Sequence, residues 1–129
     1  MTEAGPEHRQ HVAESWCRWY DRQNPDDQWA ETEVIDGITL GQESVEEGWA
    51  TVLALLTEAR SHKVLGVIGA SPIEDQLARD PSIVAGWIQA EAPSNEPLRR
   101  ALSHLWRMPL VPDDIFTAVK ALAQNDLSV

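Results

Sequence analysis

Two histidines near the start of the chain have the spacing that best suits metal binding. His8 and His11 are three residues apart, so on a helix they share a face, with Glu7 or Glu14 nearby. A zinc site normally needs three or four protein ligands. The other two histidines are isolated, and no cysteine pair is present to join them. The sequence therefore predicts no metal and no cofactor.

The remaining motifs give little support to nucleophilic catalysis or phosphate binding. Ser103 and His104 are neighbours that point in different directions on a helix, and no Gly-x-Ser-x-Gly turn accompanies them. Gly66 and Gly69 lack the Lys-Ser or Lys-Thr ending of a phosphate-binding loop. We therefore expect a protein that is not an enzyme. A deep polar pocket gathering Arg100, His104 and a carboxylate would raise the case for an enzyme, because distant residues can converge in a fold.

The adjacent carboxylates of Glu74 and Asp75 are assigned to structure rather than to acid-base catalysis. Consecutive helical residues point about 100° apart, so these two side chains do not face each other. In Ser71-Pro72-Ile73-Glu74, the serine can accept from the Glu74 amide while the glutamate reaches back. This arrangement is a capping box, and it predicts that a helix begins here.

Acidic residues are concentrated in one part of the chain. Its 129 residues carry 21 acidic and 10 basic side chains, for a net charge of -11. Between residues 21 and 60, ten acidic residues face only two arginines, which accounts for eight of the eleven net charges. This charge disfavours direct binding to nucleic acid and favours a basic partner. The alternative is an acidic surface that only keeps the protein soluble.

Trp29 lies within this acidic stretch. An aromatic side chain surrounded by carboxylates is typical of an interface hot spot for a basic partner. The competing interpretation is that Trp29 folds back to cover the core. We predict a partner-binding surface made of Asp26, Asp27, Trp29, Glu31, Glu33, Glu43, Glu46 and Glu47.

The spacing of apolar residues predicts an all-α fold, a compact bundle of about six helices in a single domain over residues 1–129. Residues 28–42 follow neither helical nor strand periodicity, so we expect an irregular acidic segment with about one helical turn. Residues 64–70 are expected to be a helix tail or a buried turn. The predicted helices cover residues 7–22 and 43–62, begin at Ser71, at Asp80-Pro81 and at Asn95, and end with 113–124.

Four of the six tryptophans occupy apolar stripe positions and are assigned to the core, namely Trp16, Trp49, Trp87 and Trp106. Cys17 is the only cysteine, which excludes an intramolecular disulfide and fits a reducing compartment. We expect it to be a buried hydrophobic residue rather than a reactive thiol.

The sequence also bears on the location of the protein. No apolar run approaches the roughly 20 residues that a membrane-spanning helix needs. The first residues are acidic and polar, unlike a secretory signal. We expect a cytoplasmic protein that does not bind membranes.

One stretch carries a resemblance to a known family. Residues 69–77 read Gly-Ala-Ser-Pro-Ile-Glu-Asp-Gln-Leu, and 88–92, 100–106 and 112–116 continue the likeness. This resembles an uncharacterised family of small bacterial proteins with a Gly-x-x-Pro-hydrophobic-Glu-Asp-x-Leu signature, and it covers the chain from Leu65 onward. The resemblance implies a helical fold. Some members of that family are suspected to be polymorphic-toxin immunity proteins, and the resemblance implies no catalytic residues.

Together these features favour a non-enzymatic protein-binding module. The first hypothesis is an immunity or antitoxin-type inhibitor that masks a basic surface of a toxin enzyme with the acidic stretch between Asp26 and Glu47. The second is an accessory or regulatory helical scaffold domain that self-associates. Clustered acidic charges accelerate the encounter with a basic toxin. Salt screens these charges, so binding of the toxin should weaken as the salt concentration rises.

Overall fold

The computed structural model describes residues 5–124, which form an all-α fold without strands in that range. The α-helices are α1 (Pro6–Arg22), α2 (Gln28–Val34), α3 (Val45–Glu58), α4 (His62–Ile68), α5 (Glu74–Arg79), α6 (Pro81–Glu91), α7 (Glu96–Leu102) and α8 (Asp113–Lys120). Shorter turns are the 3₁₀ segments η1 (Pro25–Asp27) and η4 (Ala92–Ser94) and the π-helical segments η2 (Ile35–Thr39) and η3 (Gly69–Ile73). The all-α prediction is confirmed.

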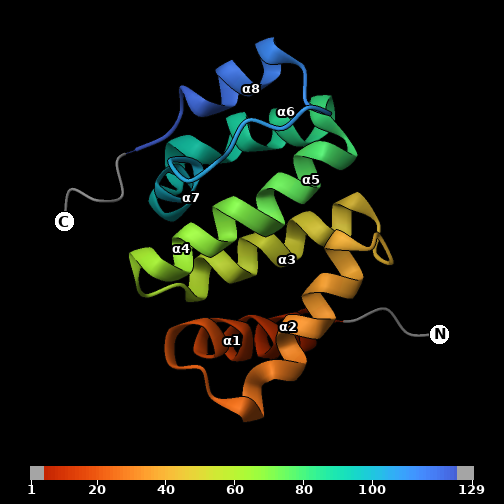
Figure 1. Ribbon diagram of the computed structural model, residues 1–129, viewed down its shortest axis with the longest axis vertical. Helices are drawn as coiled ribbons and strands as arrows, with labels where there is room; N and C mark the ends of the chain where they lie inside the picture. The colour runs from red at the N-terminus through yellow and green to blue at the C-terminus, as the bar shows by residue number, and fades with distance from the viewer. Residues whose placement is uncertain (1–4, 125–129) are drawn as a thin grey trace.

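The helices stack in layers along the long axis of the molecule (Figure 1). Helices α1 and α2 lie at one end and pack on each other, and α1 also packs on α3. Helix α4 contacts α7, and α6 contacts α8 at the opposite end. The largest fully buried apolar side chains come from most of these layers and form one cluster, including Ile38, Leu55, Leu56, Ile68, Ile73, Leu77, Ile88, Leu98 and Leu102.

The start of helix α3 is determined by its local sequence. Ser44 is its N-cap and accepts a hydrogen bond from the Glu47 amide at 3.1 Å, and the Glu47 carboxylate accepts from the Ser44 amide at 3.3 Å. This reciprocal pair is a capping box, which satisfies two backbone donors that a helix start leaves without partners. The helix is two residues shorter at its start than predicted and ends at Glu58.

The capping box predicted at Ser71 is wrong. Residues 62–79 form an uninterrupted helical stretch in which η3 joins α4 to α5, so Ser71 lies in its middle and is exposed (Figure 1). Pro72 lies inside the π-helical turn, where its missing amide is accommodated by the wider local spacing. Residues 64–68 belong to α4 and residues 69–70 to η3, and a break at residues 59–61 separates them from α3, so they are neither the tail of that helix nor a buried turn. Of the other predicted caps, Asn95 accepts from the Leu98 amide at 3.0 Å.

The segment predicted to be irregular is helical instead. Helix α2 continues into η2, where the Leu40 amide donates to the Ile35 carbonyl at 2.9 Å across five residues. The wider π-helical turn buries Ile38 and ends at Thr39. Gly41 follows shortly after it, with a φ of +72° that favours glycine. This spacing does not match a regular helical period, which is why the sequence pattern failed to indicate a helix.

The tryptophan assignments are correct except at one position. Trp16 and Trp49 are buried, and Trp87 packs partly buried against the core with its ring 6.2 Å from that of Trp49. Trp106 is 74% exposed, so its assignment to the core is wrong. Helix α7 ends at Leu102, and the helical stripe that placed Trp106 inside does not continue past that residue.

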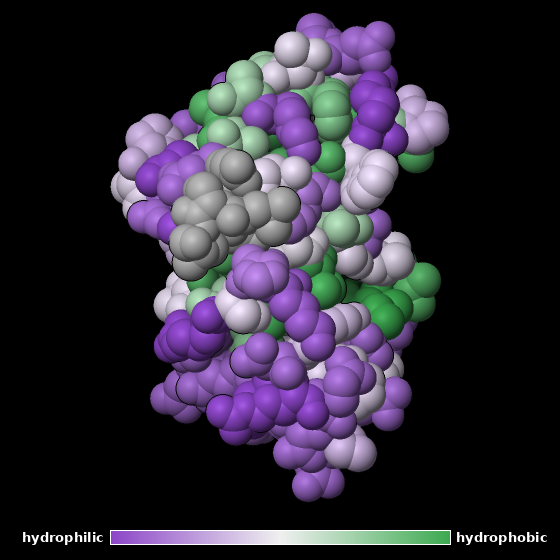
Figure 2. Space-filling model, turned by 60° about the vertical axis from the view of Figure 1, so that its left-hand side comes forward, coloured by the Kyte–Doolittle hydropathy of each residue, from purple (hydrophilic) through white to green (hydrophobic). Residues whose placement is uncertain are grey.

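Hydrophilic residues cover the α1 and α2 end of the face seen in Figure 2, and hydrophobic residues reach the surface near its middle. Within residues 5–124, no helix is both long enough and apolar enough to cross a membrane.

Candidate functional site

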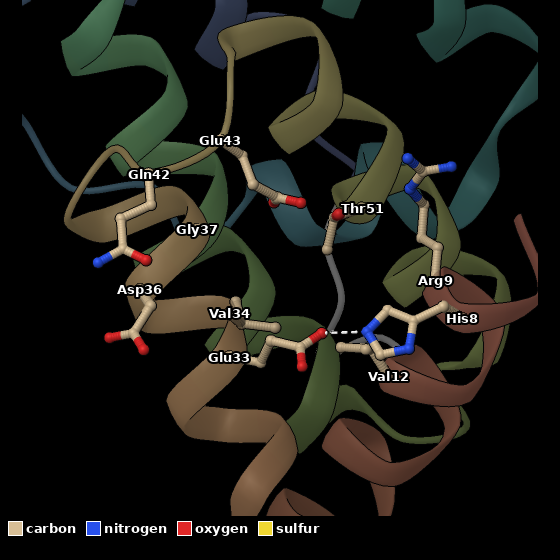
Figure 3. A pocket seen from close by; sticks show the side chains of 10 residues that line it. All are labelled: His8, Arg9, Val12, Glu33, Val34, Asp36, Gly37, Gln42, Glu43 and Thr51. Carbon is tan, nitrogen blue, oxygen red and sulfur yellow. Dashed lines mark hydrogen bonds and ion pairs between the residues drawn. The ribbon is translucent and has the colours of Figure 1, made fainter. Parts of the chain in front are cut away.

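A cavity of about 450 Å³ lies where α1, α2, η2 and the start of α3 meet. Figure 3 shows its lining, which is His8, Arg9, Val12, Glu33, Val34, Asp36, Gly37, Gln42, Glu43 and Thr51. Three carboxylates and one arginine are among these side chains, so with neutral histidine the lining carries a net charge of -2. The cavity therefore combines apolar walls with an excess of negative charge.

Glu43 is the central side chain of this cavity. Its carboxylate points across the cavity toward Thr51, whereas Asp36 and Gln42 point away from it (Figure 3). Burial raises the pKa of Glu43 above its ordinary value, and the neighbouring Glu47 adds to the increase while Arg9 opposes it. No group within residues 5–124 donates a hydrogen bond to this carboxylate. Glu43 is thus a partly desolvated acid without a donor.

The position of Glu43 depends on a glycine. A Cβ atom on Gly37 would lie 2.6 Å from Glu43 Oε1, so any larger residue would displace the glutamate. The backbone fixes the same contact, because the Glu43 amide donates to the Gly37 carbonyl at 3.0 Å and the Gln42 amide donates to the Asp36 carbonyl at 3.1 Å. The loop after η2 is therefore folded back over the π-helical turn.

His8 and Glu33 close one side of the cavity. The His8 Nε2 atom lies 2.6 Å from Glu33 Oε2, and both side chains remain nearly half exposed (Figure 3). His11, the other half of the predicted pair, instead contacts the Trp29 ring, with the ring centroids 5.0 Å apart. The two histidines thus have different partners, and residues 5–124 contain no group of three His, Cys, Asp or Glu side chains arranged to hold a metal ion.

Most of the predicted partner-binding residues have partners within the fold. Asp27 is buried and accepts from Arg18, with Nη2 3.1 Å from Oδ1, and Glu31 accepts from the Tyr20 hydroxyl. Glu33 pairs with His8, and Glu47 belongs to the capping box of α3. Trp29 is 37% exposed over His11, so it neither enters the core nor stands clear of the surface.

The other three acidic residues of the predicted partner-binding surface, Asp26, Glu43 and Glu46, differ in exposure. Asp26 and Glu46 are exposed, and Glu43 lies in the cavity. The structure therefore brings together Glu33 and Glu43 from the predicted set. Arg9, Asp36, Gly37 and Thr51 line the same cavity and were not predicted, because only the meeting of three segments puts them there.

Arg100 and His104 would raise the case for an enzyme if they lined one pocket. Instead, each of them lines a different cavity. Arg100 lines a cavity of about 660 Å³ and pairs with Glu96 at 2.8 Å. His104 lines a shallow groove of about 420 Å³ together with Trp106. These two side chains therefore line different cavities, which adjoin at His62.

The pair of carboxylates after the π-helical turn has no shared site either. Glu74 accepts a hydrogen bond from the Trp106 amide at 2.7 Å, and Asp75 accepts from the Thr39 hydroxyl at 2.7 Å. Burial raises the pKa of Glu74, and the Trp106 hydrogen bond opposes that shift. Glu74 therefore fixes the turn that follows α7, instead of capping its own helix as predicted.

Among family models, curated proteins and solved structures, only the family models give a match to this chain. Neither the curated proteins nor the solved structures include a match to this chain. A family model does match, and it covers residues 18–127, which extends well beyond the part that carries the motif resemblance. The chain belongs to a family of unknown function, DUF6869.

Proposed function

We propose that the protein is a non-enzymatic binding module of the immunity or antitoxin type, which acts in the cytoplasm and masks a basic surface of a toxin enzyme. The observation that carries this proposal is the Glu43 carboxylate, which is partly buried, has a raised pKa and accepts no hydrogen bond within the described residues. An arginine or lysine side chain entering the cavity would donate a hydrogen bond to Glu43 and add to the positive charge that Arg9 supplies.

The surroundings of the cavity support a protein partner. Its volume of about 450 Å³ exceeds what one basic side chain fills, so neighbouring atoms of the partner would also contact the apolar wall at Val12 and Val34. Exposed acids at Asp26 and Glu46 provide charge for the approach of a basic surface. The net charge of -11 and the resemblance to suspected immunity proteins favour a toxin as that partner over nucleic acid or a membrane.

Affinity capture from the host organism tests this function. The immobilised wild-type chain should enrich one specific protein with a basic surface and inhibit the activity of that protein. Glu43→Gln should reduce the amount of partner protein captured at least about tenfold, because the arginine or lysine of the partner then loses its partly buried, negatively charged counterpart. Glutamine keeps the shape of glutamate and removes a carboxylate whose ionised form burial disfavours, so this variant should fold normally.

The control for capture is Asp114→Lys. Asp114 is an exposed acid at the start of α8 and lines no cavity described here, so its reversal changes the net charge without touching the Glu43 cavity. Recovery with this variant should stay within about twofold of wild type, because charge remote from an interface contributes little. Equal recovery with Glu43→Gln and wild type, or no specific protein at all, would reject the proposal.

A second candidate is the self-associating scaffold. One observation favours it: Trp106 and Leu110 expose 74% and 76% of their surface, which is unusual for side chains of this size. A chain that remains monomeric in light scattering at high concentration would exclude this candidate.

A further inference from the structure

A groove separate from the Glu43 cavity lies between α4, η3 and the turn after α7. Its volume is about 420 Å³, and its lining is His62, Lys63, Gly66, Val67, Ala70, Ser71, His104 and Trp106. It shares no residue with the Glu43 cavity. Its walls are therefore a small-residue helix face on one side and an indole ring on the other.

The turn that carries Trp106 is held firmly in place. Lys120 Nζ donates to three carbonyl oxygens at the end of α7, those of Leu102 at 3.3 Å, Ser103 at 2.9 Å and Leu105 at 2.9 Å. A cation in this position satisfies carbonyls that a helix end leaves without partners. On the other side, Glu74 accepts from the Trp106 amide at 2.7 Å. Two side chains from different helices thus anchor the backbone on which Trp106 is exposed.

Glycines bring this turn close to α4. A Cβ atom on Gly66 would lie 3.2 Å from His104 Nδ1, and one on Gly69 would lie 2.1 Å from the Ala101 carbonyl oxygen. The close approach gives the groove a floor of backbone and small side chains. Trp106 is 74% exposed above it, so within residues 5–124 a large aromatic surface is presented from a backbone that is held in place. A preorganised tryptophan of this kind is the usual anchor of a binding hot spot.

The charge of the groove lining has the opposite sign to that of the protein. The chain carries 21 acidic residues against 10 basic ones, yet with neutral histidines the described lining of the groove carries one charge, that of Lys63, and no carboxylate. The Glu74 carboxylate lies beside the groove and already accepts from the Trp106 amide. His62 also lines the adjoining cavity, whose lining has Arg60 and Arg100 against Glu96; Arg100 pairs with Glu96 at 2.8 Å, and Arg60 lies 3.9 Å from Glu58. This edge of the molecule is therefore complementary to an acidic ligand, unlike the α1 and α2 end.

We propose that the groove is a docking site for an acidic segment of a partner protein, which packs an apolar side chain against Trp106 and places its carboxylates near Lys63. The charge complementarity selects this occupant.

Nuclear magnetic resonance of the ¹⁵N-labelled full chain with two probe peptides tests the proposal. In the first heptapeptide, glutamates alternate with leucine, phenylalanine and leucine; in the second, lysines replace the glutamates. The glutamate peptide should shift the Trp106 indole signal and the amides of residues 62–70. It should leave the amides around Glu43 unchanged, so the outcome is independent of the function proposed for that cavity.

Substitutions then test the two halves of the site. Trp106→Ala should weaken binding of the glutamate peptide at least about tenfold, as expected for a hot-spot aromatic. Lys63→Glu should weaken it at least about fivefold, because an attractive charge becomes repulsive. Arg22→Glu makes the same charge change at an exposed position on α1 outside the groove, and binding should stay within about twofold.

Three results would overturn the proposal. The first is the absence of groove shifts with the glutamate peptide. The second is equal binding of the lysine peptide to the same residues. The third is a wild-type dimer in sedimentation analysis that Trp106→Ala converts to a monomer, since a second copy would then occupy the groove. Because Trp106 is largely exposed and Lys63 is an exposed residue, both variants should keep the wild-type circular dichroism spectrum.

Discussion

Gly69→Ala should lower the free energy of unfolding by at least about 2 kcal/mol, within the range known for overpacked cores. The added methyl group would lie 2.1 Å from the Ala101 carbonyl oxygen, far inside van der Waals contact. The obstructing atom belongs to the backbone of α7, so no side-chain rotation can relieve the clash. Helix α7 would have to move away from the helical stretch that contains η3.

Gly86→Ala is the matched control for this substitution. Gly86 is inside α6, and a Cβ atom there would meet nothing within 4 Å. Alanine at this position should raise the free energy of unfolding by about 0.5 to 1 kcal/mol, because it is a better helix former than glycine. Urea denaturation followed by tryptophan fluorescence measures both variants. Similar effects of the two substitutions would contradict the close approach of η3 and α7.

Cys17 should react at least about 100-fold more slowly with a thiol reagent in the folded protein at pH 8 than in urea. Burial raises the pKa of this thiol from 9.0 to about 12, and the nearby Glu58 adds to the increase. That difference corresponds to roughly a thousandfold smaller fraction of the reactive thiolate. The Sγ atom also donates to the Leu55 carbonyl at 3.7 Å, which keeps the proton in place.

The absorbance change of an aromatic disulfide reagent measures this rate. The same raised pKa makes the folded state lose stability as pH rises above 9.0, because the unfolded chain then releases a proton that the folded chain retains. A folded-state rate similar to that in urea would show that the cavity of about 270 Å³ beside Cys17 opens the thiol to solvent. That result would contradict its place in the core.

Helix existence could be predicted from sequence wherever the apolar spacing is regular. Val12 and Trp16 recur four residues apart, and both are buried on α1 as that spacing requires. Asn95 caps α7 because its short side chain places an oxygen where it accepts from the Leu98 amide. The single cysteine was likewise correctly interpreted as a buried residue.

The errors share a physical cause, which is that local patterns do not record where a helix is interrupted. Ser71 and Glu74 have the spacing of a capping box, yet a π-helical turn carries the chain straight through them. In the sequence, Trp106 continues the apolar spacing of α7, but that helix ends at Leu102. The residues 28–42 seem irregular because η2 has more residues per turn than a regular helix.

The candidate site was predictable only in part, for a related reason. The excess of acid between residues 21 and 60 indicates a stretch that includes Glu33 and Glu43, and both of these side chains line the cavity. Nothing in the sequence shows that Arg9 from α1 and Thr51 from α3 meet Glu43 in one cavity. Nor does charge counting distinguish Glu43, which accepts no hydrogen bond within residues 5–124, from Asp27, which accepts two from Arg18.

The most direct test of the central claim is a titration of the ¹⁵N-labelled protein with N-acetylarginine amide, which presents one guanidinium group and no other charge. Shifts are expected for the amides around the cavity, at Gly37, Glu43 and Thr51. Glu43→Gln should abolish them, and Asp114→Asn, at an exposed acid outside the cavity, should leave them intact. Shifts spread evenly over the exposed acids, or cavity shifts that survive Glu43→Gln, would contradict a basic-group site at Glu43.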